Sequence, residues 1–150
     1  LLRTNKVIAC GDRVIDYKFV EDFILNLEEK YGVHIQAIGY DRWNALSTAQ
    51  KLESEGYNLV EIRQHSSVLH PPTKLLKEKI LSREFKYTRN NLLEINFQNA
   101  RCVYDTNKNQ YVNKKKSKGK VDMVVSLINA VYLLQQDYFL NQMDFVIQTF

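Results

Sequence analysis

The stretch Ile35-Gln36-Ala37-Ile38-Gly39-Tyr40-Asp41 predicts a short buried β-strand that ends at an aspartate. Apolar residues recur at helical spacing before it, from Val20 to Tyr31, and after it, from Ala45 to Leu52. A strand between two amphipathic helices is typical of an α/β fold. Since ligands in such folds bind beyond the carboxyl ends of strands, we expect Asp41 to belong to a functional site. The alternative is that Asp41 only caps the following helix.

Other patterns predict the rest of an α/β fold in one domain of 150 residues. In the first half we expect a strand at Lys6–Cys10, followed by a helix that is capped by Asp16 and ends before Gly32. After the strand that ends at Asp41, we expect a helix over Arg42–Glu55 that ends at Gly56, and then a second, parallel strand at Leu59–Ile62. Pro71-Pro72 predict the start of a further helix that runs to Ser82. In the second half we expect a short helix around Leu92–Phe97, a hairpin with its loop at Thr106–Gln110, a largely apolar helix over Val121–Gln135, and a C-terminal tail over Asp137–Phe150.

The basic residues of the chain are unevenly distributed. The net charge is +4, from 21 basic and 17 acidic residues. Five lysines with no acid among them account for this excess, because only 16 basic residues remain without them: Lys114, Lys115, Lys116, Lys118 and Lys120. Such a segment is a candidate contact for phosphate groups. The alternative is an ordinary solvated loop.

Asp41 and Asp122 suggest a site for divalent metal. Asp122 begins the apolar helix directly after the lysine-rich segment. Each aspartate could serve only to favour a helix N-terminus. Together they offer the oxygen ligands that Mg²⁺ or Mn²⁺ prefers, and a pair of such ions supports phosphodiester cleavage.

Other chemistries have less support in the sequence. It contains no P-loop, no dinucleotide-binding glycine motif and no nucleophile elbow. The histidines lack the spacing of a zinc protease. His65 and His70 flank the loop after the second predicted strand, so they form a candidate substrate loop, although a purely structural role is more common. No apolar run approaches the ~20 residues of a membrane span, so we expect no membrane partner.

Three motifs resemble the nuclease domain of tailed-bacteriophage terminase large subunits. They are Ile38-Gly39-Tyr40-Asp41-Arg42-Trp43-Asn44-Ala45, then Glu61-Ile62-Arg63-Gln64-His65 followed by Pro72-Thr73-Lys74, and Lys118-Gly119-Lys120-Val121-Asp122-Met123-Val124-Val125-Ser126-Leu127. Their order and spacing match the family from about Lys6 to Leu134. Any one of these motifs alone would be unspecific.

The resemblance implies an RNase H-like mixed sheet flanked by helices and an endonuclease site with two Mg²⁺ or Mn²⁺ ions. Asp41 and Asp122 would be the second and third acidic ligands. The lysine-rich segment and Arg63 would contact double-stranded DNA. The family cuts concatemeric viral DNA during packaging, with an ATPase domain in the same polypeptide, a portal and a small terminase subunit as partners. The implied location is the cytoplasm of the bacterial host, transiently at the procapsid portal.

One feature of the family has no counterpart in this sequence. The family's first aspartate lies on a strand upstream of Lys6–Cys10, and Asp12 and Asp16 follow that strand rather than precede it. We therefore expect a nuclease domain truncated at its N-terminus, with weak metal binding and low activity when alone. Its exposed sheet edge would favour self-association.

Two other functions remain open at the level of sequence. The chain could be a non-catalytic module that binds DNA or docks a protein, through the lysine-rich segment and the aromatic tail. It could also be another RNase H-like nuclease, such as a junction resolvase.

Overall fold

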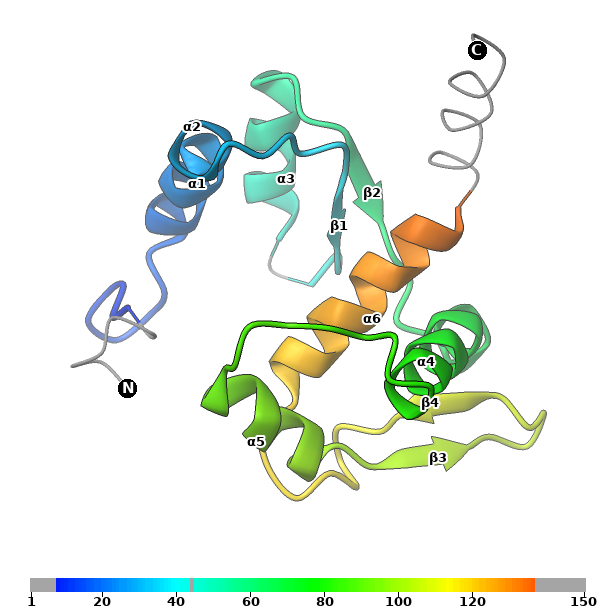
Figure 1. Ribbon diagram of the computed structural model, residues 1–150. Coiled ribbons are helices and arrows are strands. Elements are labelled where there is room, and N and C mark those ends of the chain that lie inside the picture. Colours follow the sequence, from blue (N-terminus) through cyan, green and yellow to red (C-terminus); the bar gives the residue numbers. More distant parts are fainter. Residues whose placement is uncertain (1–7, 44, 137–150) are drawn as a thin grey trace, which may run out of the picture. The chain divides into compact units, whose positions relative to one another are not determined.

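The computed structural model describes residues 8–43 and 45–136 (Figure 1). The chain divides into two compact units, Leu1–Val60 (unit 1) and Glu61–Phe150 (unit 2). The strand predicted before Asp41 and the strand predicted at Leu59–Ile62 both form. They are β1 (Ile38–Tyr40) and β2 (Leu59–Glu61), which make a two-stranded sheet. The backbone N–H of Ile38 donates to the carbonyl of Asn58 at 2.8 Å, next to the start of β2.

The first helix of unit 1 begins at its predicted cap and ends at its predicted glycine, whereas the helix predicted over Arg42–Glu55 begins later, at Leu46. Asp16 accepts the backbone N–H of Lys18 at 3.0 Å and starts α1 (Tyr17–Leu25). The prediction of a single helix up to Gly32 is wrong, because the helix is divided at Asn26 into α1 and α2 (Leu27–Tyr31). Gly32 ends α2 with φ of 62°, a left-handed conformation that glycine adopts without steric cost.

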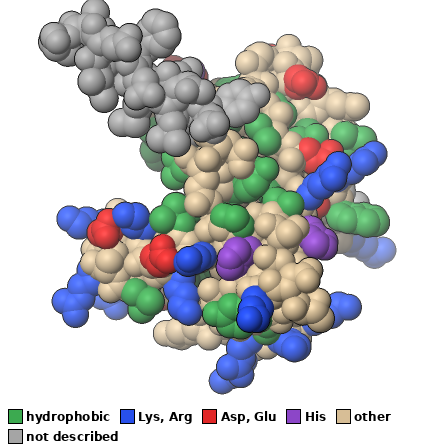
Figure 2. Space-filling model, turned by 90° about the vertical axis from the view of Figure 1, so that its right-hand side faces the viewer, with side chains coloured by type: hydrophobic (Ala, Val, Ile, Leu, Met, Phe, Trp, Pro, Cys, Tyr) green, Lys and Arg blue, Asp and Glu red, His purple; other side chains and the backbone are tan. Residues whose placement is uncertain are grey.

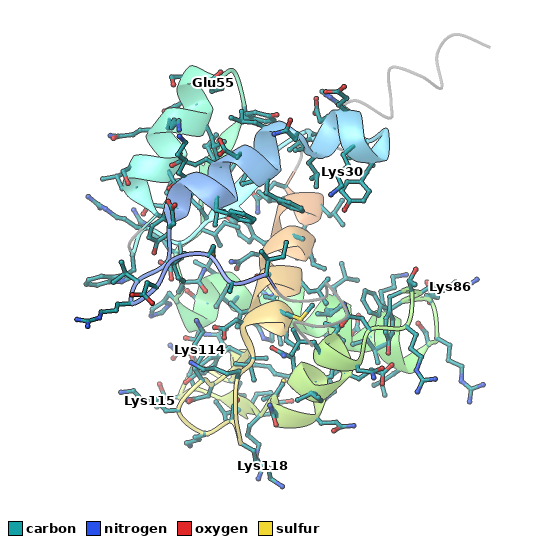
Figure 3. All side chains as sticks on the ribbon, turned by 90° about the vertical axis from the view of Figure 1, so that its left-hand side faces the viewer. Lys30, Glu55, Lys86, Lys114, Lys115 and Lys118 are labelled. Atoms are coloured by element: carbon teal, nitrogen blue, oxygen red, sulfur yellow. The ribbon has the colours of Figure 1, made fainter. Side chains whose placement is uncertain are left out.

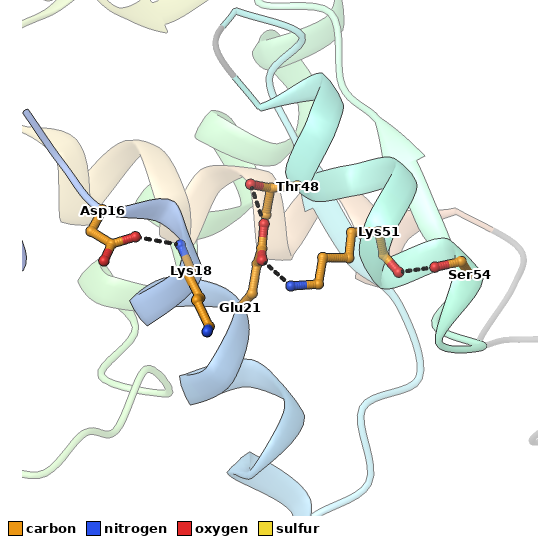
Figure 4. A network of polar contacts seen from close by, with 6 residues as sticks. All are labelled: Asp16, Lys18, Glu21, Thr48, Lys51 and Ser54. Atoms are coloured by element: carbon orange, nitrogen blue, oxygen red, sulfur yellow. Dashed lines mark hydrogen bonds and ion pairs between the residues drawn. The ribbon is translucent and has the colours of Figure 1, made fainter.

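A buried carboxylate connects α1 to α3 (Leu46–Ser54) (Figure 4). Glu21 on α1 accepts hydrogen bonds from Thr48 Oγ1 at 3.0 Å and from Lys51 Nζ at 2.6 Å. The hydrogen bond from Lys51 lowers the pKa of the Glu21 carboxyl. Ala49 and Leu52 of α3 are buried beside this network, so α3 combines an apolar face with a paired charge.

The described part of unit 2, up to residue 136, contains three helices and a hairpin. The helices are α4 (Ser66–Leu81), α5 (Asn91–Asn99) and α6 (Asp122–Gln135). Strands β3 (Cys102–Tyr104) and β4 (Gln110–Val112) pair in antiparallel register, with Val103 opposite Tyr111. The α4 helix packs against α6 and β4, and α5 packs against α6 (Figure 1). Buried apolar side chains hold these contacts: Leu69, Leu76, Leu93, Val112, Val124, Ile128 and Leu133.

The start of α4 differs from the prediction. We expected Pro71 and Pro72 to open the helix, yet α4 begins five residues earlier, where His65 caps it by accepting the backbone N–H of Ser67 at 3.3 Å. Proline within a helix lacks the N–H that would bond to the preceding turn. Pro72 is among the most deeply buried side chains, so packing compensates for the missing bonds.

Two other predicted elements differ in extent or lie outside the described residues. The described part of the predicted first strand, Ile8–Cys10, has no strand structure, and Ile8 is exposed. Leu1 to Lys6 and Val7 lie outside the described residues, as does the predicted tail Asp137–Phe150. None of the helices in residues 8–43 and 45–136 is long and apolar enough to cross a membrane.

Candidate functional site

Asp41 directly follows β1 in unit 1, as predicted. Its Oδ1 atom accepts the backbone N–H of Trp43 at 3.3 Å, and its side chain is half-buried. The following helix, α3, begins only at Leu46, and its N-cap residue Ala45 makes no side-chain capping bond. The interpretation of Asp41 as the helix cap is therefore wrong. Trp43, two residues after Asp41, is 84% exposed.

Asp122 is the first residue of α6 in unit 2. Its carboxylate is 69% exposed and lies 3.9 Å from the Lys114 ammonium group. It is the acidic residue of the first turn, where a negative charge favours the helix dipole. It also lies beside a hollow of about 500 Å³ lined by Leu93, Met123 and neighbouring α6 residues. The Asp122 carboxylate thus lies at the start of a helix and is largely open to solvent.

The first turn of α6 is held by a residue that sequence reasoning missed. The N-cap residue Val121 provides no side-chain bond. Instead, Asn96 of α5 accepts the backbone N–H of Met123 at 3.1 Å through Oδ1, and its amide group donates to the carbonyl of Leu92 at 2.9 Å. Asn96 is only 4% exposed. The signal that could have found it is an asparagine among apolar residues of a helix, where a buried amide needs partners.

The lysine-rich segment is a structured loop fastened at both of its ends. At one end Asn113 accepts the backbone N–H of Lys116 at 3.0 Å, and its own N–H donates to the carbonyl of Arg101 at 2.9 Å. At the other end the Asn99 carbonyl accepts the N–H of Lys118, and its side-chain amide donates to the Lys120 carbonyl, both at 3.1 Å. The loop backbone therefore has a defined path between β4 and α6.

The lysine side chains of this loop extend into solvent. All five are exposed: Lys114, Lys115, Lys116, Lys118 and Lys120. Figure 3 shows the labelled lysines 114, 115 and 118 pointing away from the body of unit 2. On the face shown in Figure 2, further Lys and Arg side chains lie around the lower part of the view, with few acidic ones between them. The five exposed lysines of the ordered loop are suited to contacts with phosphate groups.

The other predicted site residues of unit 2 have mainly structural contacts. His65 caps α4, and its Nδ1 lies 2.8 Å from Ser67 Oγ. His70 is inside α4 rather than in a loop, and its Nδ1 accepts the backbone N–H of Gln110 at 2.7 Å. An Nδ1 atom that accepts carries no proton, so this bond requires the neutral ring. Arg63 is exposed in the connection between β2 and α4.

The two aspartates are suitable ligands for a hard divalent cation, but two side chains do not make a complete metal site. Asp41 and Asp122 offer carboxylate oxygens, the ligands that Mg²⁺ and Mn²⁺ prefer. Within residues 8–43 and 45–136, no group of three His, Cys, Asp or Glu side chains could hold a metal ion. Asp41 lies in unit 1 and Asp122 in unit 2.

The comparisons with known proteins identify the family. Two solved structures resemble the chain. The large terminase of bacteriophage HK97 matches with a TM-score of 0.78 and 22% sequence identity over 88% of this chain. The large terminase nuclease of the thermophilic phage G20c matches with a TM-score of 0.61 and 20% sequence identity over 78% of this chain. The matches span 28% of the first protein and 62% of the second. The fold is thus a mixed α/β, RNase H-like architecture.

A search of curated proteins found no match. The family model described as terminase large subunit, endonuclease domain, matches residues 5–137. The match spans most of the 150 residues and includes Asp41, Asp122 and the lysine-rich loop. The chain therefore belongs to the endonuclease-domain family of phage terminase large subunits.

Proposed function

We propose that this chain is the part of a phage terminase large subunit that cuts double-stranded DNA, with residues 1–150 acting as one nuclease domain. The observation that carries the proposal is the exposed Asp122 carboxylate, which begins α6 at the end of an ordered, lysine-rich loop. This arrangement brings a potential metal ligand and a phosphate-binding loop together within unit 2. Family membership supplies the reaction class, hydrolysis of phosphodiester bonds.

Asp41 and Asp122 would each supply a ligand to Mg²⁺ or Mn²⁺, with two ions in the complete site. When bound, such ions activate a water molecule and stabilise the negative charge that develops on the phosphate. The role of the chain is to hold its carboxylates in place. The hydrogen bond from Trp43 to Asp41 and the attachment of the α6 N-terminus to Asn96 restrict the two aspartates locally.

The lysine-rich loop and Arg63 would contact the sugar-phosphate backbone. Contacts of this kind position DNA without reading its sequence. The substrate we propose is concatemeric viral DNA. The proposed partners are an ATPase domain of the same polypeptide, the portal and the small terminase subunit. The proposed location is the host cytoplasm, with transient residence at the procapsid portal.

A plasmid-nicking assay tests the proposal. A protein extended upstream of Leu1 is incubated with supercoiled plasmid and Mg²⁺ or Mn²⁺. We expect nicking that Asp41→Asn and Asp122→Asn each abolish, whereas the exposed Asp12→Asn, a matched change of charge, leaves it intact. Unchanged cleavage by both site variants would overturn the metal assignment.

Two additional measurements on the same protein, DNA binding at several salt concentrations and cleavage of branched DNA, separate the proposal from the other candidate functions. DNA binding that weakens steeply with salt, with no cleavage in either metal, would indicate a non-catalytic module. Strong preference for a branched substrate over linear duplex would indicate a junction resolvase.

A further inference from the structure

Three aromatic rings line an open pocket of unit 2 that the proposed nuclease site does not use. Phe85 and Tyr87 lie in the connection between α4 and α5, and Phe97 lies on α5. The Phe85 and Tyr87 rings are 5.5 Å apart with 31° between their planes, and the Phe85 and Phe97 rings meet edge-on at 6.2 Å. They enclose part of a hollow of about 490 Å³. This space exceeds what one nucleobase requires.

The rings are not sealed in an apolar core. Tyr87 is 47% exposed, so part of its ring remains in contact with solvent. Every nucleobase has a π-face, and stacking on aromatic side chains is how many proteins hold unpaired bases. An exposed ring that also contacts the Phe85 ring is suited to such stacking.

The rim of the pocket has both a hydrogen-bond donor and an acceptor. Arg83 and Glu94 line the same hollow as the three rings. Arginine only donates hydrogen bonds, and an ionised glutamate only accepts them. The edges of nucleobases present donors and acceptors together, so both groups can find a partner on one base. An acidic peptide would place its carboxylates against Glu94 and is therefore disfavoured.

The connection that carries the pocket is basic. It contains Arg83, Lys86 and Arg89, and among the residues that the structure describes none of these three forms an ion pair. Its acid, Glu84, pairs with Lys79. In Figure 3, Lys86 extends from the side of unit 2 opposite to Lys114 and Lys115. This basic surface is thus separate from the lysine-rich loop and available for phosphates next to a stacked base.

The backbone at Arg83 adopts a conformation that favours glycine. Arg83 follows the end of α4 with φ of 61°. Its backbone N–H donates to the carbonyl of Ile80 at 3.1 Å, and the next N–H groups donate to Lys79, which closes the helix end. Glycine is the usual residue at this position. A long cationic side chain kept at a strained position points to a role for its guanidinium group.

We propose that this pocket binds an unstacked base of single-stranded nucleic acid, with Tyr87 as the stacking platform and Arg83, Lys86 and Arg89 on the flanking phosphates. This inference rests on the proposed function for its substrate class. It adds to that function a site for a strand that has left the duplex, and this site needs no metal.

The test uses the 150-residue chain in EDTA with a short oligothymidine that contains one 2-aminopurine, whose fluorescence falls when it stacks on an aromatic ring. We expect saturable quenching. Tyr87→Ala should reduce the affinity at least about fivefold and remove the quenching, since stacking of one base contributes this much or more. Arg83→Gly should also weaken binding while the chain melts at the same or a higher temperature, because glycine relieves the left-handed backbone.

The Arg83→Gly variant distinguishes binding from folding. Weaker binding by a chain of equal or greater stability supports the proposal. Absence of quenching in the wild type, or equal affinity in wild type, Tyr87→Ala and Arg83→Gly, overturns it. Plasmid nicking by the protein extended upstream of Leu1 reports on the proposed function separately, and its Tyr87→Ala variant should nick normally. A wild type that shows quenching but does not nick would count against the nuclease function alone. A wild type that nicks but shows no quenching would count against the base pocket alone.

Discussion

The side-chain oxygen of Asn96 accepts the backbone N–H of Met123 at 3.1 Å and thereby attaches the first turn of α6 to α5. Helix N-termini leave backbone N–H groups without intrahelical partners, and a preceding side chain normally satisfies one of them. In α6 the preceding residue is Val121, which cannot do so, and a residue 27 positions away takes this role. The position of Asp122 therefore depends on α5.

Replacement of Asn96 should destabilise the chain more than replacement of an exposed asparagine on the same helix. Asn96→Ala leaves the Met123 N–H without its partner and removes the bond to Leu92. We expect a loss of about 1–3 kcal/mol in the free energy of unfolding. Urea denaturation measures it, with the exposed Asn91→Ala as the control. Equal stability of both variants would contradict the capping role of Asn96.

The close approach of Asn99 to Gly119 gives a coupled prediction. A Cβ atom on Gly119 would lie 2.7 Å from Asn99 Nδ2, so Gly119→Ala must displace this side chain and break its bond to Lys120. We expect Gly119→Ala alone to cost on the order of 1 kcal/mol. In a chain that already carries Asn99→Ala, Gly119→Ala should leave the free energy of unfolding almost unchanged. A double-mutant cycle in urea that gives additive effects would contradict this contact.

Acid should weaken the attachment of the hairpin to α4 through Asp105. Hydrogen bonds from Ser66 and from Asn109 lower the pKa of the Asp105 carboxyl to about 2. Since this pKa is depressed in the folded state, the ionised group stabilises the fold above about pH 4, and this contribution is lost as the pH falls toward 2. Asp105→Asn should thus be less stable than wild type at pH 7, with a difference that shrinks below pH 4. Thermal melts over this pH range measure it, and a difference independent of pH would contradict it.

The lysine-rich loop should bind DNA without sequence preference. If Lys115, Lys116 and Lys118 each contact one phosphate, each alanine variant should lower the slope of log K against log salt concentration by about 0.9. Fluorescence anisotropy with two unrelated duplexes measures the slopes. Lys30→Ala, an exposed lysine of α2 outside the loop, is the control and should leave the slope unchanged. A slope unaffected by the loop variants would remove the loop from the DNA interface.

The sequence predicts local features of this molecule better than distant ones. The strand before Asp41, the cap at Asp16 and the stop at Gly32 depend on neighbouring residues, and the structure confirms all three. The hydrogen bonds between Met123 and Asn96 and between Asn99 and Lys120 join residues more than twenty positions apart, so no local pattern identifies the partner of either asparagine.

The start of α4 was mispredicted for a similar reason. The rule that proline opens a helix is local, whereas the burial of Pro72 against distant residues decides the outcome. Motif order along the chain did predict the family, because it combines three distant segments.

Mn²⁺ binding followed by electron paramagnetic resonance tests the central claim most directly, because it reports the ligands without requiring cleavage. In a protein extended upstream of Leu1, Asp41→Asn and Asp122→Asn should each weaken Mn²⁺ binding at least about tenfold, as the loss of a metal ligand predicts. Asp12→Asn should bind as the wild type does. Mn²⁺ affinity unchanged in both site variants would contradict the assignment of Asp41 and Asp122 as metal ligands.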